Sequence, residues 1–276
     1  MKLKHIRRDL RKIGRYGGVV QIAQSKSVIH STDSDQEGHE LVTEPLVSPT
    51  GPGGAAGFRN RNGSQIAKPE VTNVYLGPFW GDRTFVDQFS SDLLTHGYLD
   101  PLAELGAGTG PGTFLGSIDG PDVSGQDFPE EMAQQVVSQL ADAGKIAPNV
   151  NSLYVMILPD GVVATMGTDS SCSAFCGYHD AFTYNGTVVA YAVLPSTLCR
   201  GCGGQIGDFT AVYAHELAEA ATDKVPGQGW VADDGQENGD LEAWILKPWG
   251  PPINPNLYTI QGYYTNERGN TIGAWH

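Results

Sequence analysis

The chain has 276 residues, of which 40% are hydrophobic, and its 36 glycines and 17 prolines predict a turn-rich fold with one principal domain. The formal net charge at pH 7 is −14, although Lys and Arg are concentrated at the N-terminus and the rest of the chain is more acidic still. Such an acidic body repels the phosphate backbone, so neither DNA nor RNA is expected as a partner.

Residues 1–70 are expected to form a disordered N-terminal arm. The first fifteen positions are rich in Lys and Arg, and residues 24–68 are rich in Ser, Gly, Pro and charge, a composition typical of a linker or a propeptide. No stretch reaches the roughly 18 apolar residues of a membrane span, and no apolar core of a secretion signal is visible near the N-terminus. The folded domain is therefore expected over residues 71–276.

The hydrophobic pattern of this domain alternates between strands and helices. Strands are predicted over residues 72–76, 152–158 and 187–193, and helices over residues 83–95, 130–142 and 209–223. This order predicts an α+β fold in which a mixed sheet packs against the last helix, as in zincin-like proteins.

The last predicted helix carries the sequence His-Glu-Leu-Ala-Glu at positions 215–219. Residues i and i+4 project from the same face of a helix, so His215 and Glu219 can hold one cation, with Glu216 beside the attacking water. The usual zinc hydrolase motif has a second histidine where this chain has Glu219, which is an acceptable oxygen ligand but a less specific signal.

This helix is expected to be buried. Asp208 is its predicted N-terminal cap, Pro226 and Gly227 end it, and apolar residues cover much of its circumference. Buried acidic groups and histidine must be satisfied, and a bound cation would do so. The alternative is an exposed polar stripe, since such a short string also arises by chance.

A third ligand is predicted in the acidic segment downstream. Glu237 is the candidate ligand, and Asp240 and Asp223 are candidate carboxylates that orient the ligands from the second coordination layer. The same segment also resembles a solvated turn or an irregular calcium loop, so both Zn²⁺ and Ca²⁺ remain open as the metal.

Four cysteines occur in two local pairs, which suggests two disulfides, although the spacing also suits a zinc ion on four thiolates. His179, close after the first pair, is a further candidate ligand or catalytic proton donor. The alternative is that His179 makes a hydrogen bond in a packed loop. The cysteines are Cys172, Cys176, Cys199 and Cys202.

From about Val71 onward, the chain resembles the plant EXORDIUM or phosphate-induced protein family and its microbial relatives. The resemblance is carried by the order of the segments at positions 175–179, 214–219, 222–223 and 237–240, together with the cysteine pairs. It implies a secreted or cell-wall-associated protein in an oxidising compartment, and the family has no firmly assigned reaction.

Two functions follow as expectations. The first is a zinc-dependent metallohydrolase acting on peptides, in which His215, Glu219 and Glu237 hold the metal and Glu216 is the general base. The second is a non-catalytic extracellular binding protein, associated with the cell wall, whose metal only ties the helix to the acidic loop. A third, lesser alternative is a structural domain without metal.

Overall fold

The computed structural model describes residues 19–21, 57–79, 81–108, 111–243, 245–265 and 269–270. The expected disordered arm therefore falls largely outside the described residues. The description resumes at Gly57, where Phe58 and Ile66 already pack into the core. These two residues lie on the N-terminal side of the domain start expected near Val71.

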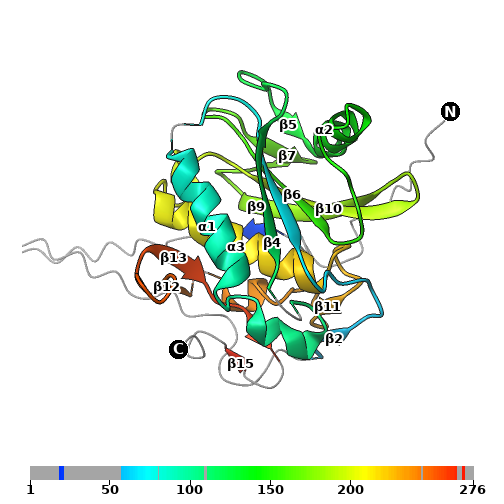
Figure 1. Ribbon diagram of the computed structural model, residues 1–276, viewed down its shortest axis with the longest axis vertical. Helices are drawn as coiled ribbons and strands as arrows, with labels where there is room; N and C mark the ends of the chain where they lie inside the picture. The colour runs from blue at the N-terminus through cyan, green and yellow to red at the C-terminus, as the bar shows by residue number, and fades with distance from the viewer. Residues whose placement is uncertain are drawn as a thin grey trace, which may run out of the picture.

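A six-stranded mixed sheet forms the centre of the molecule (Figure 1). Its strand order is β1-β9-β10-β6-β3-β4. The strands β4, β3, β6 and β10 are parallel to one another, whereas β9 is antiparallel to both β10 and β1. The bounds are β1 Val19–Gln21, β3 Glu70–Tyr75, β4 Thr113–Asp119, β6 Ser152–Ile157, β9 Phe175–Tyr184 and β10 Thr187–Leu194.

Helices cover both faces of this sheet and give three layers. The helices α1 (Arg83–Thr95) and α3 (Ile206–Thr222) pack on one face, and α2 (Glu130–Asp142) packs on the other. Each face has its own apolar core, because alternate residues of β3, β6 and β10 point to opposite sides. The predicted α+β class is thus confirmed.

Short elements complete the fold around these layers. The remaining strands are β2 (Arg59–Asn60) paired with β11 (Trp230–Val231), β5 (Phe128–Pro129) with β7 (Ala164–Met166) and β8 (Asp169–Ser170), β12 (Leu246–Trp249) with β13 (Tyr258–Gln261), and β14 (Tyr264–Thr265) with β15 (Gly269–Asn270). Three 3-10 helices occur among the described residues, η1 (Asp100–Leu105), η2 (Arg200–Cys202) and η3 (Asp240–Glu242). No helix of the described residues is long and apolar enough to cross a membrane.

Most predicted elements are confirmed at or near their predicted bounds, but α3 begins earlier than expected. Gln205 is its N-terminal cap, not Asp208 as the sequence suggested. Asp208 sits within the first turn, where its Oδ2 accepts a hydrogen bond from the Gln205 amide at 3.1 Å. The two residues form a capping box, so Asp208 stabilises the same end of the helix from one turn further along.

Burial of α3 is confirmed, since every residue from Phe209 to Thr222 is buried. Sheet residues cover one side of the helix, and β13 contributes to the cover of another. The polar side chains of α3 are therefore enclosed by protein, which excludes the exposed stripe considered above.

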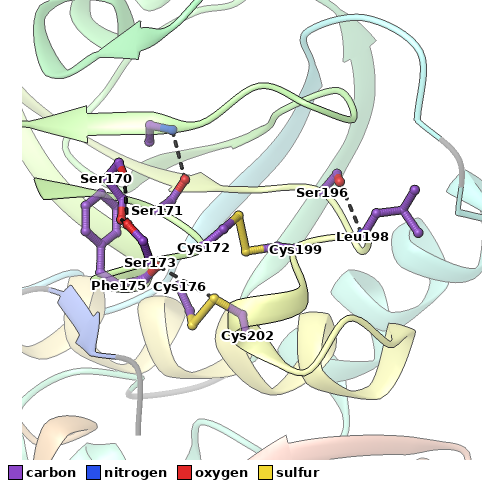
Figure 2. Close-up of a disulfide and its surroundings, with 11 residues drawn as sticks. Ser170, Ser171, Cys172, Ser173, Phe175, Cys176, Ser196, Leu198, Cys199 and Cys202 are labelled. Atoms are coloured by element: carbon purple, nitrogen blue, oxygen red, sulfur yellow. Dashed lines mark hydrogen bonds between the residues drawn. A yellow bond between two sulfur atoms is a disulfide. The ribbon is translucent and has the colours of Figure 1, made fainter. Parts of the chain in front are cut away.

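Two disulfides link the start of β9 to the segment before α3 (Figure 2). Cys172 is bonded to Cys199 and Cys176 to Cys202, with Cα–Cα distances of 5.2 and 5.5 Å. The bonds join the two sequence pairs to each other, and they leave no thiolates for the four-thiolate zinc alternative. For loops of this length each bond contributes about 3 to 4 kcal/mol to stability in the chain-entropy model. Together they fasten β9 against α3.

Candidate metal centre

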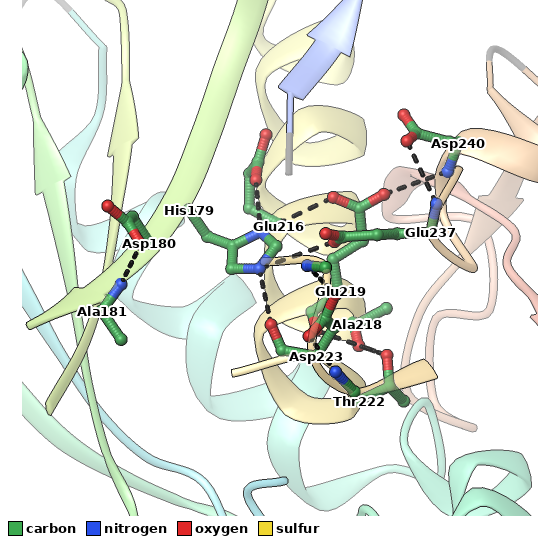
Figure 3. Close-up of polar contacts among 12 residues, drawn as sticks. His179, Asp180, Ala181, Glu216, Ala218, Glu219, Thr222, Asp223, Glu237 and Asp240 are labelled. Atoms are coloured by element: carbon green, nitrogen blue, oxygen red, sulfur yellow. Dashed lines mark hydrogen bonds and ion pairs between the residues drawn. The ribbon is translucent and has the colours of Figure 1, made fainter. Parts of the chain in front are cut away.

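Buried acidic and histidine side chains converge where β9, α3 and the segment leading into η3 meet (Figure 3). β9 contributes one histidine, and α3 contributes a histidine and two glutamates. Two further carboxylates come from the segment leading into η3 and from its first residue. The six residues, called the acidic cluster below, are His179, His215, Glu216, Glu219, Glu237 and Asp240.

The helical spacing expected for α3 is present. His215 and Glu219 lie one turn apart, and His215 Nε2 is 2.9 Å from Glu219 Oε1. The same carboxylate oxygen accepts a hydrogen bond from the backbone amide of Asp240 at 3.0 Å. Glu219 therefore contacts both His215 on its own helix and the η3 segment.

His179 lies on β9 and points at α3. Its Nε2 lies 3.0 Å from the backbone carbonyl oxygen of Asp223, to which it donates when that nitrogen carries the proton. In that tautomer the lone pair of Nδ1 faces Glu216 Oε2 at 3.5 Å and Glu219 Oε2 at 3.6 Å. A ring held by one N–H on a carbonyl, with the other nitrogen toward carboxylates, is the usual arrangement of a metal-binding histidine.

The ligand-type atoms form two overlapping groups. His179, Glu219 and Glu237 make up the first group, which is fully buried, and His215, Glu219 and Asp240 make up the second. Within each group the atoms all lie within 4.8 Å of one another. The predicted ligand set of His215, Glu219 and Glu237 is thus divided between the two groups, and Glu219 belongs to both.

Several of these buried atoms have no hydrogen-bond partner among the described residues. They are His179 Nδ1, His215 Nε2, Glu219 Oε2 and both carboxylate oxygens of Glu216 and Glu237. An ionised group buried without compensation costs several kcal/mol, and unpaired buried polar atoms are rare in folded proteins. These atoms include members of both groups, which could hold a metal ion.

The electrostatics of the acidic cluster agree with this conclusion. Burial by itself lowers the pKa of His179, but the facing carboxylates of Glu216 and Glu219 raise it well above the usual value. Burial raises the pKa of Glu237 well above its usual value. Burial also raises the pKa of Glu216 to about 7. The raised pKa values mean that these side chains retain protons at a higher pH than usual. A divalent cation would replace those protons.

Two glycines let the surrounding backbone approach this cluster. A Cβ atom on Gly177 of β9 would lie 2.9 Å from Glu216 Oε1. A Cβ atom on Gly239 would lie 2.9 Å from both Glu219 Oε1 and His215 Nδ1. Neither position has a left-handed backbone, so glycine is required here for space rather than for conformation.

Gln261 at the end of β13 also contacts the site and was not predicted from the sequence. Its Nε2 lies 2.5 Å from His215 Nδ1 and donates a hydrogen bond to the backbone oxygen of Gly239 at 3.0 Å. No motif surrounds Gln261 in the sequence; its role comes from the packing of β13 against α3. It fixes the ring of His215 and the η3 segment together.

Asp223 and Asp240, which were predicted to orient the ligands, both contact residues of the acidic cluster. Asp223 contacts His179 with its backbone oxygen, while its carboxylate accepts from the amides of Gly227, Gln228 and Gly229. Asp240 Oδ2 accepts from the backbone amide of Glu237 at 3.2 Å, and its Oδ1 is 3.9 Å from His215 Nε2. Both aspartates therefore shape the loops that present the ligands.

The donor set distinguishes the candidate metals. Zn²⁺ is commonly bound by a mixture of histidine nitrogen and carboxylate oxygen, whereas Ca²⁺ takes six to eight oxygen ligands. Histidine nitrogen is present in both groups of the acidic cluster, and the His179 ring is already oriented for ligation. The residues could therefore hold a metal ion, and their histidine nitrogens are compatible with Zn²⁺.

Access from solvent is limited. The side chains of His179, Glu219 and Glu237 are fully buried, while that of Asp240 is 12% exposed. An open cavity of about 320 Å³ lies at the N-terminal ends of α1 and α3, lined in part by Asp82, Phe85 and Ile206, and no residue of the acidic cluster lines it.

Comparisons of the chain with family models, with curated proteins and with solved structures find no match. The resemblance to the EXORDIUM family therefore stays an expectation from the sequence motifs.

Proposed function

We propose that this protein is a zinc-dependent hydrolase that acts on peptide bonds, with the acidic cluster as its active centre. The observation that carries the proposal is the set of buried ligand-type atoms without hydrogen-bond partners on His179, Glu219 and Glu237, beside the carboxylate of Glu216. Histidine nitrogen and carboxylate oxygen are both accepted ligands of Zn²⁺, which supports this assignment.

Each residue has a definite role in this proposal. His179, Glu219 and Glu237 hold the metal, while His215 belongs to the second group of ligand atoms and contacts Glu219. When bound, zinc supplies Lewis acidity that polarises the scissile carbonyl. Glu216 is the general base, because its buried carboxylate lies 3.5 Å from the ring of His179 and belongs to neither group of ligand atoms.

A second function, a binding protein with a structural metal, is favoured by the burial of the site. A structural zinc site is closed by its protein ligands, whereas a catalytic site keeps a position open for substrate. The additional carboxylates, which also offset the charge of a cation and weaken its Lewis acidity, support this alternative. Here the metal would tie β9, α3 and η3 together.

We further propose that the protein acts outside the cell, on a peptide or on a cell-wall-associated substrate. Two disulfides fit an extracellular protein, because such bonds persist in oxidising compartments. The EXORDIUM resemblance points to the same location. No nucleic acid is proposed as a partner, given the acidic charge.

Replacement of Glu216 by Gln separates the two functions. For a hydrolase, Glu216→Gln should keep the zinc content and the melting temperature near those of the wild type, while zinc-dependent cleavage of a peptide library falls by about 10²- to 10⁴-fold. Glu219→Ala should lose metal and activity together. The catalytic proposal fails if the zinc-loaded wild type cleaves no peptide and Glu219→Ala only lowers the melting temperature.

A further inference from the structure

One of the two edge strands of the sheet, β1, comes from the N-terminal part of the chain and pairs with β9. In β1, Val19 pairs with Tyr178, Val20 with Gly177, and Gln21 with Phe175, all antiparallel. The pairing of β9 with β10 ends at Tyr178. Gly177 therefore has β1 as its strand neighbour within the sheet.

This edge of β9 borders the acidic cluster. Tyr178 directly precedes His179, the proposed ligand, and the Cα of Gly177 lies against Glu216, as the space for a Cβ atom shows. Figure 3 shows β1, the blue strand, next to the helix that carries Glu216 and Glu219. A chain paired with Gly177 and Tyr178 thus runs beside the metal centre.

β1 is a minimal strand of three residues, distant in sequence from the rest of the sheet. Its short ladder offers few hydrogen bonds to hold it. Charge supplies a second attraction, because the segment before β1 is rich in Lys and Arg while the chain beyond it is strongly acidic. β1 is therefore suited to be a partner that β9 can exchange for another extended chain.

Without β1, residues 175–178 of β9 would present backbone N–H and C=O groups at a sheet edge. Such an edge binds an extended chain by adding it as a strand, whatever the source of that chain. We propose that this edge of β9 is the binding site for an extended peptide, and that Val19–Gln21 occupies it within the same molecule and closes the metal centre to peptides.

The fate of the bound peptide depends on the proposed hydrolase function, but the binding of the peptide does not. Binding itself needs the β9 edge alone. An extended peptide in the place of β1 would run antiparallel to β9 and have its backbone opposite Tyr178 and Gly177. Because the pairing is antiparallel, the residue that precedes the partner of Tyr178 in the peptide would lie opposite His179. This places a peptide bond beside the acidic cluster.

The test uses the full chain with proline in β1. Proline has no backbone N–H and a fixed φ, so Val19→Pro with Val20→Pro should prevent β1 from joining the ladder. Val28→Pro with Ile29→Pro is the matched control, because it replaces two consecutive β-branched residues by proline outside β1. The rate of amide hydrogen exchange at residues 175–178 shows whether β1 is paired with this edge of β9, and it does not depend on any activity.

Peptide binding is measured in the same chains by fluorescence anisotropy. The probe is a labelled peptide of residues 16–24, and every chain also carries Glu216→Gln so that the probe is not consumed. The β1 variant should show faster exchange over residues 175–178 and bind the probe about tenfold more tightly than the control and the parent chain. A tenfold change corresponds to an edge occupied by β1 about 90% of the time.

The outcomes separate this inference from the proposed function. Equal exchange and equal probe affinity in the three chains would overturn the inference, whatever the activity. Faster exchange and tighter binding would support it. If the β1 variant binds the probe but, with Glu216 intact and zinc present, cleaves no peptide, then the proposed hydrolase function fails while the peptide site remains.

Discussion

Replacement of Gly239 by alanine places one methyl group against the acidic cluster. The added Cβ would lie 2.9 Å from both Glu219 Oε1 and His215 Nδ1, closer than most Cβ contacts in proteins. Overpacking of this kind costs about 1 to 3 kcal/mol. If that strain falls on the metal-bound state, zinc affinity should decrease by about 5- to 150-fold, since 1.4 kcal/mol corresponds to a factor of ten.

The assay compares zinc titration calorimetry with the melting temperature of the same protein. For a domain of 150–250 residues, 1 kcal/mol shifts the melting temperature by about 2 to 4 °C. The control is Gly144→Ala, at an exposed position after α2 where a Cβ meets no atom within 4 Å but φ is +68°. That variant should lose about 1 to 2 kcal/mol of stability through backbone strain without a change in zinc affinity.

The two variants thus test whether the space at Gly239 serves the metal or only the fold. If Gly239→Ala binds zinc as tightly as Gly144→Ala while both lose stability, the contacts of Gly239 with Glu219 and His215 do not belong to a metal centre.

Three further results are expected. Zinc at 100 times its dissociation constant should stabilise the fold by about 2.7 kcal/mol, so that chelation lowers the melting temperature by about 5 to 11 °C, and an unchanged value would contradict a bound metal. Peptide mapping without reduction should recover Cys172 linked to Cys199 and Cys176 linked to Cys202, and links within each local pair would contradict this connectivity. Burial and the nearby Asp180 raise the pKa of Glu130 from 4.5 to about 7, so the folded state holds more protons than the unfolded state and stability falls as pH rises through this window. Glu130→Gln should therefore raise the melting temperature more at pH 8 than at pH 4.5, relative to the exposed control Asp127→Asn, and an equal effect at both pH values would refute the assignment.

The helices α1 and α2 were predicted with their observed bounds because their signals are local. The apolar periodicity of each helix and its flanking residues are enough to place it, and the same holds for the continuous apolar runs of β6 and β10. The pairing of His215 with Glu219 was likewise predictable, since one helical turn fixes it.

The other half of the acidic cluster depends on contacts distant in sequence. His179 was a candidate ligand or proton donor, but β9 was not predicted as a strand, so its position opposite α3 could not be derived. The cysteine spacing predicts two disulfides without their connectivity, which is set by the approach of β9 to the segment before α3. The contact of Gln261 with His215 likewise exists only because β13 packs on α3.

The metal content of the purified protein tests the central claim most directly. The measurement is elemental analysis by mass spectrometry of the wild type, His179→Ala and Glu219→Ala, with His96→Ala as the control at a histidine whose side chain is 37% exposed. The acidic cluster predicts bound zinc in the wild type and in His96→Ala, and its loss from the other two variants. Zinc that is absent from the wild type after growth and dialysis with added zinc, or that is equal in all four proteins, would contradict a metal centre formed by His179 and Glu219.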